Sequence, residues 1–313
     1  MSGVDQHHAL NPSQQAVLDQ LAIKEPREFA ADLAVHLRSE LERDLAPLVR
    51  HLEEDETVMV SKATIERVLG CERKFLAEDA VQFEWSVPMA RGLVTHKAIE
   101  ISVVRKDVLP SLDVIDEAIA RLQNGGNNFA DWLTHCTEAE LDEIRIDANN
   151  RFSSFCEAWP PIKRQWFPAT EMPLRVELFE GRVTLQGKPD LTLGRARGCE
   201  ARKVIVDFKT GKQHRAHRND MRFYGLLDAI KIGTPPRLLV TAYLDSAAND
   251  TEVVTEETLE LAINRTADAT NALVELRHAG RPAVERPGPS CRWCTELAQC
   301  ESGQAFVAND DDI

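Results

Sequence analysis

The most informative part of this chain is GKPDLTLGRARGCEARKVIVDFKTGK, residues 187–212. The apolar run Val204–Val206, followed by Asp207, Phe208 and Lys209, predicts a short buried strand. Because alternate side chains share one face of a strand, Asp207 and Lys209 should point the same way. The turn-rich residues 194–202 predict a hairpin loop. Asp190–Leu193 is then the partner strand, which can bring a second carboxylate alongside Asp207.

Two neighbouring carboxylates repel each other unless a cation lies between them. We therefore expect the loss of either Asp190 or Asp207 to leave the stability of the metal-free protein unchanged or to raise it. Hard oxygen ligands beside a lysine are what a Mg²⁺ or Mn²⁺ site for phosphodiester cleavage requires. The alternative is a surface hairpin with a solvated ion pair. The string Pro189-Asp190 … Asp207-x-Lys209 resembles the signature of the PD-(D/E)xK nucleases.

A histidine upstream adds to this resemblance. Residues 91–104 place apolar side chains at helical spacing, with His96 among them. A lone histidine on such a helix is more often a packed boundary residue. The string Gly92-x-x-x-His96-x-x-x-Glu100, however, resembles the first motif of RecB-type nucleases, which implies that His96 is a metal ligand. A mixed nitrogen and oxygen site suits Mn²⁺ somewhat better than Mg²⁺.

The cysteines form a second pattern. Cys291, Cys294 and Cys300 follow a Pro-Gly-Pro segment near the C-terminus, and Cys71 lies far upstream in LGCERKF. This quartet resembles the iron–sulfur staple of the AddB nuclease domain and of the CRISPR-associated exonuclease of spacer acquisition. The resemblance implies a 4Fe–4S cluster on these four thiolates. A structural Zn²⁺ and reduced cysteines without metal are the alternatives.

A third motif follows the Asp-x-Lys strand. Asp220-Met-Arg-Phe-Tyr224 lies on an expected helix and resembles the Gln-x-x-x-Tyr motif of RecB-like nucleases. Asp220 replaces the usual glutamine with an anion, which leaves its role open. The resemblance implies that Tyr224 contacts DNA, and the alternative is that it packs on the sheet.

The motifs arrive in family order over roughly residues 58–302. The resemblance implies an α/β fold with a restriction-endonuclease-like mixed central sheet flanked by helices. It implies that His96, Asp190, Asp207 and the backbone carbonyl of Phe208 hold the divalent metal. Lys209 would act with the two aspartates in catalysis, by orienting water and stabilising the transition state. Glu177, on the preceding hairpin, is a candidate extra carboxylate, and its alternative is an exposed strand residue.

Charge is unevenly distributed along the chain. The formal net charge of −14 argues against nucleic acid at first sight. Residues 188–224, however, contain ten Lys or Arg against four Asp or Glu, a net +6, so the remainder carries −20. A localised basic groove on an acidic body can bind phosphates and still release product; for residues 195–203 alone, a solvated loop is as good an explanation. The expected DNA-binding residues are Lys212, Arg215, Arg218, Arg222 and Tyr224.

The remaining elements fit one large domain with additions. We expect a helical N-terminal segment (1–57), a nuclease domain closed by the cluster (58–303) and an acidic disordered tail (304–313). Gly125-Gly126 separates two helices, and Glu180-Gly181 marks a hairpin turn. Expected helices are 12–22, 29–52, 91–104, 112–122, 138–159 and 256–279, with Ser61 capping another that carries Cys71 and with strands at 174–193 and 237–244.

Composition sets the cellular context. With 313 residues, 43% of them hydrophobic, the chain can bury a full core, and it contains no run long enough for a membrane span. Seven cysteines without a secretory segment favour a reducing cytoplasm, with Cys136, Cys156 and Cys199 as ordinary residues. No Walker A motif is present, which excludes a motor.

The resemblance therefore implies a divalent-metal-dependent, RecB-like DNA exonuclease that hydrolyses phosphodiester bonds at single-stranded or unwound DNA ends, in DNA repair, recombination or defence. A separate helicase is a possible partner, and no membrane is involved. The alternative is a weakly active or inactive nucleic-acid-binding subunit of a helicase–nuclease complex.

Overall fold

The computed structural model describes residues 9–53, 56–105, 107 and 109–310. Its centre is a five-stranded mixed sheet with the strand order β10-β9-β8-β6-β3. β8 and β9 run parallel, and the other neighbours are antiparallel. The strands are β3 (Ala169–Thr170), β6 (Leu191–Leu193), β8 (Val204–Lys209), β9 (Leu238–Tyr243) and β10 (Ala248–Val253). The predicted pairing of Asp190–Leu193 with the Asp-x-Lys strand is confirmed, since Leu191 lies opposite Val206.

Two smaller sheets complete the β-structure. A three-stranded sheet has the order β2-β5-β4, in which β2 and β5 run parallel. The predicted turn at Glu180-Gly181 joins β4 to β5, with φ of 59° at Glu180 and 95° at Gly181. The strands are β2 (Val58–Val60), β4 (Leu174–Leu178) and β5 (Val183–Gly187), and the separate pair is β1 (Arg27–Glu28) with β7 (Glu200–Ala201).

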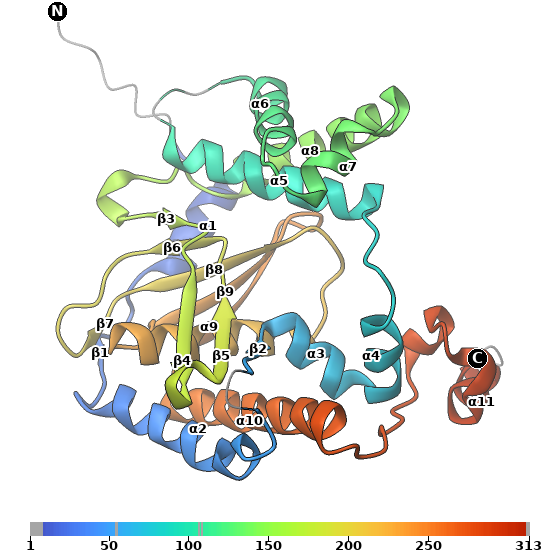
Figure 1. Ribbon diagram of the computed structural model, residues 1–313. Coiled ribbons are helices and arrows are strands. Elements are labelled where there is room, and N and C mark those ends of the chain that lie inside the picture. Colours follow the sequence, from blue (N-terminus) through green and yellow to red (C-terminus); the bar gives the residue numbers. More distant parts are fainter. Residues whose placement is uncertain (1–8, 54–55, 106, 108, 311–313) are drawn as a thin grey trace, which may run out of the picture.

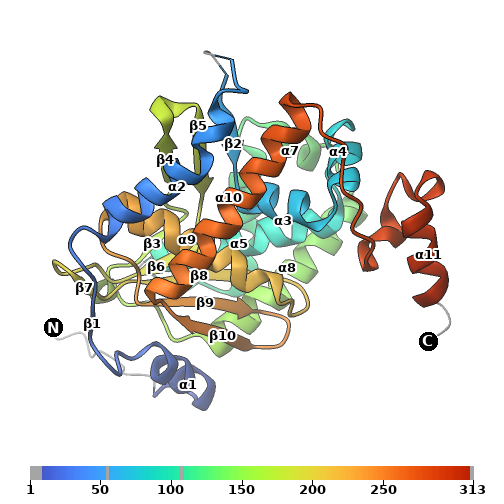
Figure 2. The same ribbon diagram turned by 90° about the horizontal axis from the view of Figure 1, so that it is seen from below.

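Helices cover both faces of the central sheet (Figure 1). On one face lie α5 (Val87–Val104), α6 (Ser111–Gln123), α7 (Asn128–Thr134) and α8 (Glu138–Ala158). On the other lie α2 (Leu33–Val49), α9 (Ala216–Ile232) and α10 (Glu256–His278). Figure 2 shows α11 set apart from this body, beyond α4. The remaining helices are α1 (Pro12–Leu21), α3 (Lys62–Gly70), α4 (Glu72–Asp79), α11 (Glu301–Asp310) and the 3₁₀ turns Arg164–Trp166, Phe179–Gly181, Pro289–Trp293 and Leu297–Gln299.

Strand β8 is buried on both faces, which explains its continuous apolar run. Val206 and Phe208 face the α5–α8 layer, where the Phe208 ring meets the edge-on rings of Phe155 and Trp159 at centroid distances of 5.3 and 5.4 Å. Ile205 faces the α9 layer. Asp207 therefore points toward α9, away from the aromatic packing.

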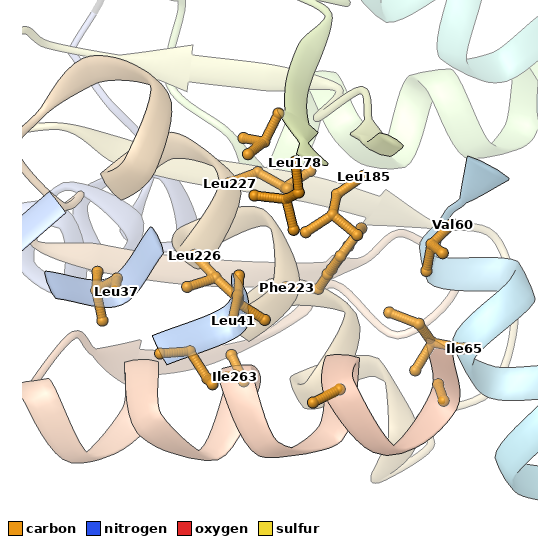
Figure 3. Close-up of a cluster of buried hydrophobic side chains, with 14 of the residues drawn as sticks. Leu37, Leu41, Val60, Ile65, Leu178, Leu185, Phe223, Leu226, Leu227 and Ile263 are labelled. Atoms are coloured by element: carbon orange, nitrogen blue, oxygen red, sulfur yellow. The ribbon is translucent and has the colours of Figure 1, made fainter. Parts of the chain in front are cut away.

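The N-terminal segment shares the core of the second layer. The leucines of α2 recur at helical spacing and are buried against α9 and α10 (Figure 3). Leu37 and Leu41 of α2 lie in the same cluster as Leu226 of α9 and Ile263 of α10. Segment 1–57 thus contains the two expected helices, shortened to 12–21 and 33–49, and the second helix packs within the fold. The boundary at residue 57 stays a prediction.

The expected disordered tail is wrong where the structure describes it. Residues 304–310 continue α11, which begins at Glu301. The Gln304 side chain donates hydrogen bonds to the carbonyls of Leu297 and Ala298, at 3.0 and 2.9 Å. These hydrogen bonds hold α11 against the preceding turn. The acidic composition of the segment was therefore a poor guide to whether it is ordered. The rest of the predicted tail, 311–313, lies outside the described residues.

The other predicted helices and strands are present, with ends shifted by a few residues. The helix expected to carry Cys71 is the exception, because it is divided into α3 and α4 with Cys71 in extended backbone between them. Strands β1, β2, β3, β7 and β10 and helices α7 and α11 were not predicted. Among the described residues, no helix is both long enough and apolar enough to cross a membrane.

Candidate active site

A row of carboxylates crosses three neighbouring strands of the central sheet. The register of β6 on β8 places Asp190 opposite Asp207. The register of β3 on β6 places Glu171 beside Asp190, and the Glu171 N–H donates to the Asp190 carbonyl at 3.2 Å. The sheet itself therefore brings together acids that lie up to 36 residues apart in the chain.

The strand ends of the smaller sheet bring a lysine to the same place. β2 and β5 are parallel and in register, so both chains leave the sheet at one edge. After β2, Ser61 caps α3 by accepting from the Thr64 N–H at 3.2 Å, and Lys62 is the first helical residue. After β5 come Gly187 and the Lys-Pro-Asp turn. A Cβ at Gly187 would lie 2.6 Å from Cε1 of Tyr224, so only glycine permits this close approach.

His96 on α5 contacts the middle carboxylate of the row. Its Nδ1 lies 2.9 Å from Oδ1 of Asp190, while Oδ2 of Asp190 accepts from the Phe208 N–H at 2.6 Å. Burial by itself would lower the pKa of His96, but Asp190, with Asp207 and Glu171 nearby, outweighs burial and raises this pKa. A metal ion that uses this imidazole as a ligand would compete with its proton.

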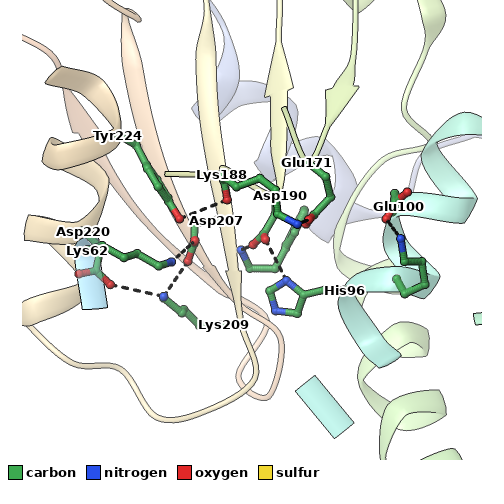
Figure 4. A network of polar contacts seen from close by, with 12 residues as sticks. Lys62, His96, Glu100, Glu171, Lys188, Asp190, Asp207, Lys209, Asp220 and Tyr224 are labelled. Carbon is green, nitrogen blue, oxygen red and sulfur yellow. Dashed lines mark hydrogen bonds and ion pairs between the residues drawn. The ribbon is translucent and has the colours of Figure 1, made fainter. Parts of the chain in front are cut away.

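Asp207 is held between two lysines (Figure 4). Its side chain is 3% exposed, with Lys62 Nζ at 2.9 Å from Oδ1 and Lys209 Nζ at 2.8 Å from Oδ2. Burial would raise the pKa of Asp207, but the two lysines outweigh it and hold this pKa well below its usual range. Asp207 and Lys209 point the same way, as their spacing predicts.

Helix α9, on the face of the sheet toward which Asp207 points, contributes Asp220 and Tyr224 from adjacent turns. Asp220 lies 3.5 Å from Lys209 Nζ, so the unusual acid at the glutamine position holds the lysine of the Asp-x-Lys motif. Tyr224 is 2% exposed and donates to the Lys188 carbonyl at 3.2 Å, with Lys62 above its ring. Its burial favours the packing alternative over direct contact with DNA.

The structure replaces the expected extra carboxylate. Among the described residues, one group of three potential ligands lies within 4.8 Å of one another, and it consists of His96, Glu171 and Asp190. Glu177 is instead an exposed residue of β4 that pairs with Arg175 at 2.8 Å. The hairpin alternation directs the Glu177 side chain to solvent, which agrees with the alternative that Glu177 is an exposed strand residue. Asp207 lies next to this group but is engaged by the two lysines.

Two residues of the site were not predicted. Lys62 holds Asp207 from a helix start 145 positions upstream, and Glu171 comes from the segment between β3 and β4. Glu171 adopts the left-handed region, with φ of 54°, and pairs with Lys188. Such a conformation in a residue other than glycine is uncommon and concentrates at functional sites.

The predicted basic residues divide into two sets. Lys212 and Arg215 are exposed in the loop between β8 and α9. Arg218 pairs with Asp250 at 2.7 Å and Arg222 with Glu252 at 2.6 Å, both acids belonging to β10. Their role in DNA binding stays a prediction, with Lys212 and Arg215 the more available pair.

The four predicted cluster cysteines line one pocket, although Cys71 lies 220 positions from Cys291. Cys71 joins α3 to α4, and the other three come from the turns before α11. None of the seven cysteines forms a disulfide. The Gly288 N–H donates to Cys291 Sγ at 3.4 Å. A Cβ at Gly303 would lie 3.3 and 3.6 Å from the sulfurs of Cys300 and Cys291, so glycine keeps this side of the pocket open.

Charged side chains fasten the two halves of this pocket. Glu72, which follows Cys71, is 1% exposed and accepts from the Val284 N–H at 2.7 Å and from Arg281 at 2.9 Å. Arg73 reaches Glu285 at 2.7 Å and the Gln299 carbonyl at 2.8 Å. The start of α4, next to Cys71, is therefore held against the C-terminal segment by contacts independent of the thiols.

An Asp-x-Lys strand beside a second carboxylate, in a mixed sheet between helical layers, defines an α/β nuclease with a restriction-endonuclease-like core. The chain belongs to the PD-(D/E)XK nuclease superfamily, whose family model matches residues 59–301. A search of curated proteins found no match.

Solved structures provide distant likenesses. One is the crystal structure of SSO0001, with 13% identity, a TM-score of 0.34 and coverage of 86% of this chain and 97% of that chain. Another is the Eubacterium rectale protein described as "Putative exonuclease", with 12% identity, a TM-score of 0.45 and coverage of 80% and 88%. The family assignment rests on the family model alone.

Proposed function

We propose that this protein is a divalent-metal-dependent DNA exonuclease of the RecB-like group that carries a 4Fe–4S cluster. It acts on single-stranded or unwound DNA ends, in DNA repair, recombination or defence. The observation that carries the proposal is the row of Glu171, Asp190 and Asp207, flanked by His96 on one side and by Lys209 on the other.

The donor set fits a divalent cation. The ligand atoms of His96, Glu171 and Asp190 lie within 4.8 Å of one another, and one nitrogen with two carboxylates suits Mn²⁺ or Mg²⁺. We assign these three residues as ligands, with Asp207 and the Phe208 carbonyl completing the site. A cation bound there supplies Lewis acidity toward the phosphate and lowers the pKa of a bound water.

The chain's own residues prepare the site for that chemistry. Asp207 and Asp220 hold Lys209 Nζ at the edge of the carboxylate row, where its positive charge can stabilise the charge that develops on phosphate. The Phe208 N–H fixes the orientation of the Asp190 carboxylate. Asp207 is buried and Asp190 and Glu171 are partly buried, which restrains these ligands before substrate binds.

Lys209→Ala should retain Mn²⁺ binding but lose most of its turnover, because its charge acts in the transition state. We expect kcat to fall by about 10²-fold, with KM little changed. Steady-state cleavage of labelled single-stranded DNA checks this, with Lys231→Ala at the far end of α9 as control. A loss confined to KM would make Lys209 a phosphate contact without a role in turnover.

The pocket of four cysteines suits a cluster better than a single zinc ion. Four thiolates at about 2.3 Å from one Zn²⁺ would lie about 3.8 Å from one another. Among the described residues, only the His96 group brings three ligand atoms within 4.8 Å, so the thiols are spread more widely than one zinc ion requires. Wider spacing is consistent with a 4Fe–4S cluster, and the N–H donated to Cys291 is a contact that stabilises thiolate sulfur.

A second candidate function is a nucleic-acid-binding subunit that does not cleave. The specific observation in its favour is that Lys62 and Lys209 already neutralise Asp207, as a metal ion would. The two candidates differ in one assay: digestion of end-labelled DNA with Mn²⁺ supports the nuclease, whereas binding without digestion supports the subunit. For both candidate functions we propose a cytoplasmic location and a separate helicase as the partner that unwinds DNA.

A further inference from the structure

A surface pocket lies beside the site, where α3, α9 and α10 meet. Its lining includes Lys62 of α3, Asn219 and Asp220 of α9, and Arg265 of α10. Lys62 connects this pocket to the carboxylate row, because its Nζ contacts Asp207. The pocket therefore opens next to the site where we propose that DNA is cleaved.

The charges around this pocket are compensated, with one exception. Asp220 is near Lys209, and Arg222 pairs with Glu252 at 2.6 Å. Over the described ranges 9–53, 56–105, 107 and 109–310, Arg265 has neither a carboxylate nor a hydrogen-bond partner. Its side chain is nevertheless half-buried.

A half-buried guanidinium without an anion is unusual. The cost of desolvating a charge is normally offset by pairing, and most arginines near this site are paired. The planar fork of arginine matches the oxygens of a phosphate, and its charge-assisted hydrogen bonds are among the stronger ones. Arg265 thus has the properties of a phosphate ligand whose partner arrives with the substrate.

We propose that Arg265, together with Lys62, forms a second phosphate-binding subsite, which holds a backbone phosphate of the DNA strand next to the one that is cleaved. This inference rests on the proposed nuclease function and adds the path of the strand, which passes over α10 and the start of α3. Arg265 is a binding and positioning residue here and takes no part in the chemical step.

The test is binding of a fluorescent single-stranded oligonucleotide by the full-length protein in EDTA, across roughly 50 to 200 mM salt. Arg265→Ala should weaken binding by about five- to tenfold and lower the slope of log K against log salt by about 0.7, the contribution of one phosphate contact. Arg265→Lys should keep the slope and recover part of the affinity. Exposed Arg50, at the end of α2, provides the control Arg50→Ala, which should match wild type.

A cleavage assay with Mn²⁺ distinguishes failure of the Arg265 subsite from failure of the proposed nuclease function. If wild type binds and cleaves DNA, and Arg265→Ala shows the same affinity and salt slope, the subsite is refuted and the nuclease function stands. If Arg265→Ala lowers affinity while kcat at saturating DNA is unchanged, the subsite is supported. If wild type neither binds nor cleaves DNA, both proposals fail together.

Discussion

Asp207→Ala should reduce DNA cleavage in Mn²⁺ by about 10³-fold or more, while the fold and most of the DNA binding are retained. Asp207 is both a proposed metal ligand and the anchor of Lys209 Nζ, at 2.8 Å, so one substitution removes two functions. Asp207→Asn keeps the volume and loses the charge, and it should be almost as inactive. End-labelled single-stranded DNA, followed over time, gives the measurement.

A matched control exists elsewhere in the core. Asp228 is also buried and paired with a lysine, since Lys203 Nζ lies 2.7 and 2.9 Å from its two carboxylate oxygens. Asp228→Asn should change stability but leave turnover per folded molecule intact. If Asp207→Ala cleaves DNA as fast as Asp228→Asn does, Asp207 is not part of the active site.

The structure reverses the expected effect of Asp207→Ala on stability. The sequence suggested that the loss of one of two neighbouring carboxylates would relieve repulsion. Each oxygen of Asp207 is instead paired with a lysine, and these lysines are only 29% and 19% exposed. Removing the carboxylate leaves two ammonium groups close together, so we expect the free energy of unfolding of the metal-free protein to fall by roughly 1–3 kcal/mol.

Loss of any one cluster cysteine should bleach the protein and lower its melting temperature. A cluster that joins Cys71 to the Cys291–Cys300 group closes a loop of over two hundred residues. By analogy with a disulfide of similar span, that closure is worth roughly 4–5 kcal/mol, and metal ligation adds to it. Iron content, visible absorbance and thermal unfolding of anaerobically purified variants provide the measurements.

The remaining cysteines are the control for this prediction. Cys136→Ala, Cys156→Ala and Cys199→Ala should keep the colour, because these residues lie outside the pocket of the quartet. Activity in the quartet variants should fall indirectly, through loss of order. A wild-type protein that binds neither iron nor zinc would refute a metal centre that joins Cys71 to the C-terminal cysteines, as would full cluster content in Cys71→Ala.

Local sequence was sufficient to predict an element and its pairing where the spacing of apolar residues was clear and the partner strand lay close in the chain. The alternation in Val204–Lys209 and the turn before it predicted β8, its pairing with β6 and the approach of Asp190 to Asp207. The leucine spacing of α2 predicted its helix but not its place in the main core, since a stripe of leucines does not identify its partner. β10 escaped prediction because ANDTEV is a polar edge strand without an apolar face.

The missing site residues illustrate the limit of motif reading. Lys62 reaches Asp207 because β2 and β5 are parallel and end at the same edge, a relation that no local pattern around Ser61 and Lys62 reveals. Glu171 joins the row through the register of a two-residue strand, which is too short to carry a period. The left-handed backbone conformation at Glu171 could not be predicted either, because the residue is not a glycine.

We propose that His96, Glu171 and Asp190 bind a metal ion that DNA cleavage requires. The most direct measurement is digestion of 5′- and 3′-labelled single-stranded DNA with and without Mn²⁺, with wild type, Glu171→Gln and Glu177→Gln compared. Wild type and Glu177→Gln should digest DNA equally and only with Mn²⁺, whereas Glu171→Gln should be slower by about 10- to 100-fold and need more Mn²⁺. DNA left intact by wild type with Mn²⁺, or equal rates for the two glutamine variants, would contradict the account.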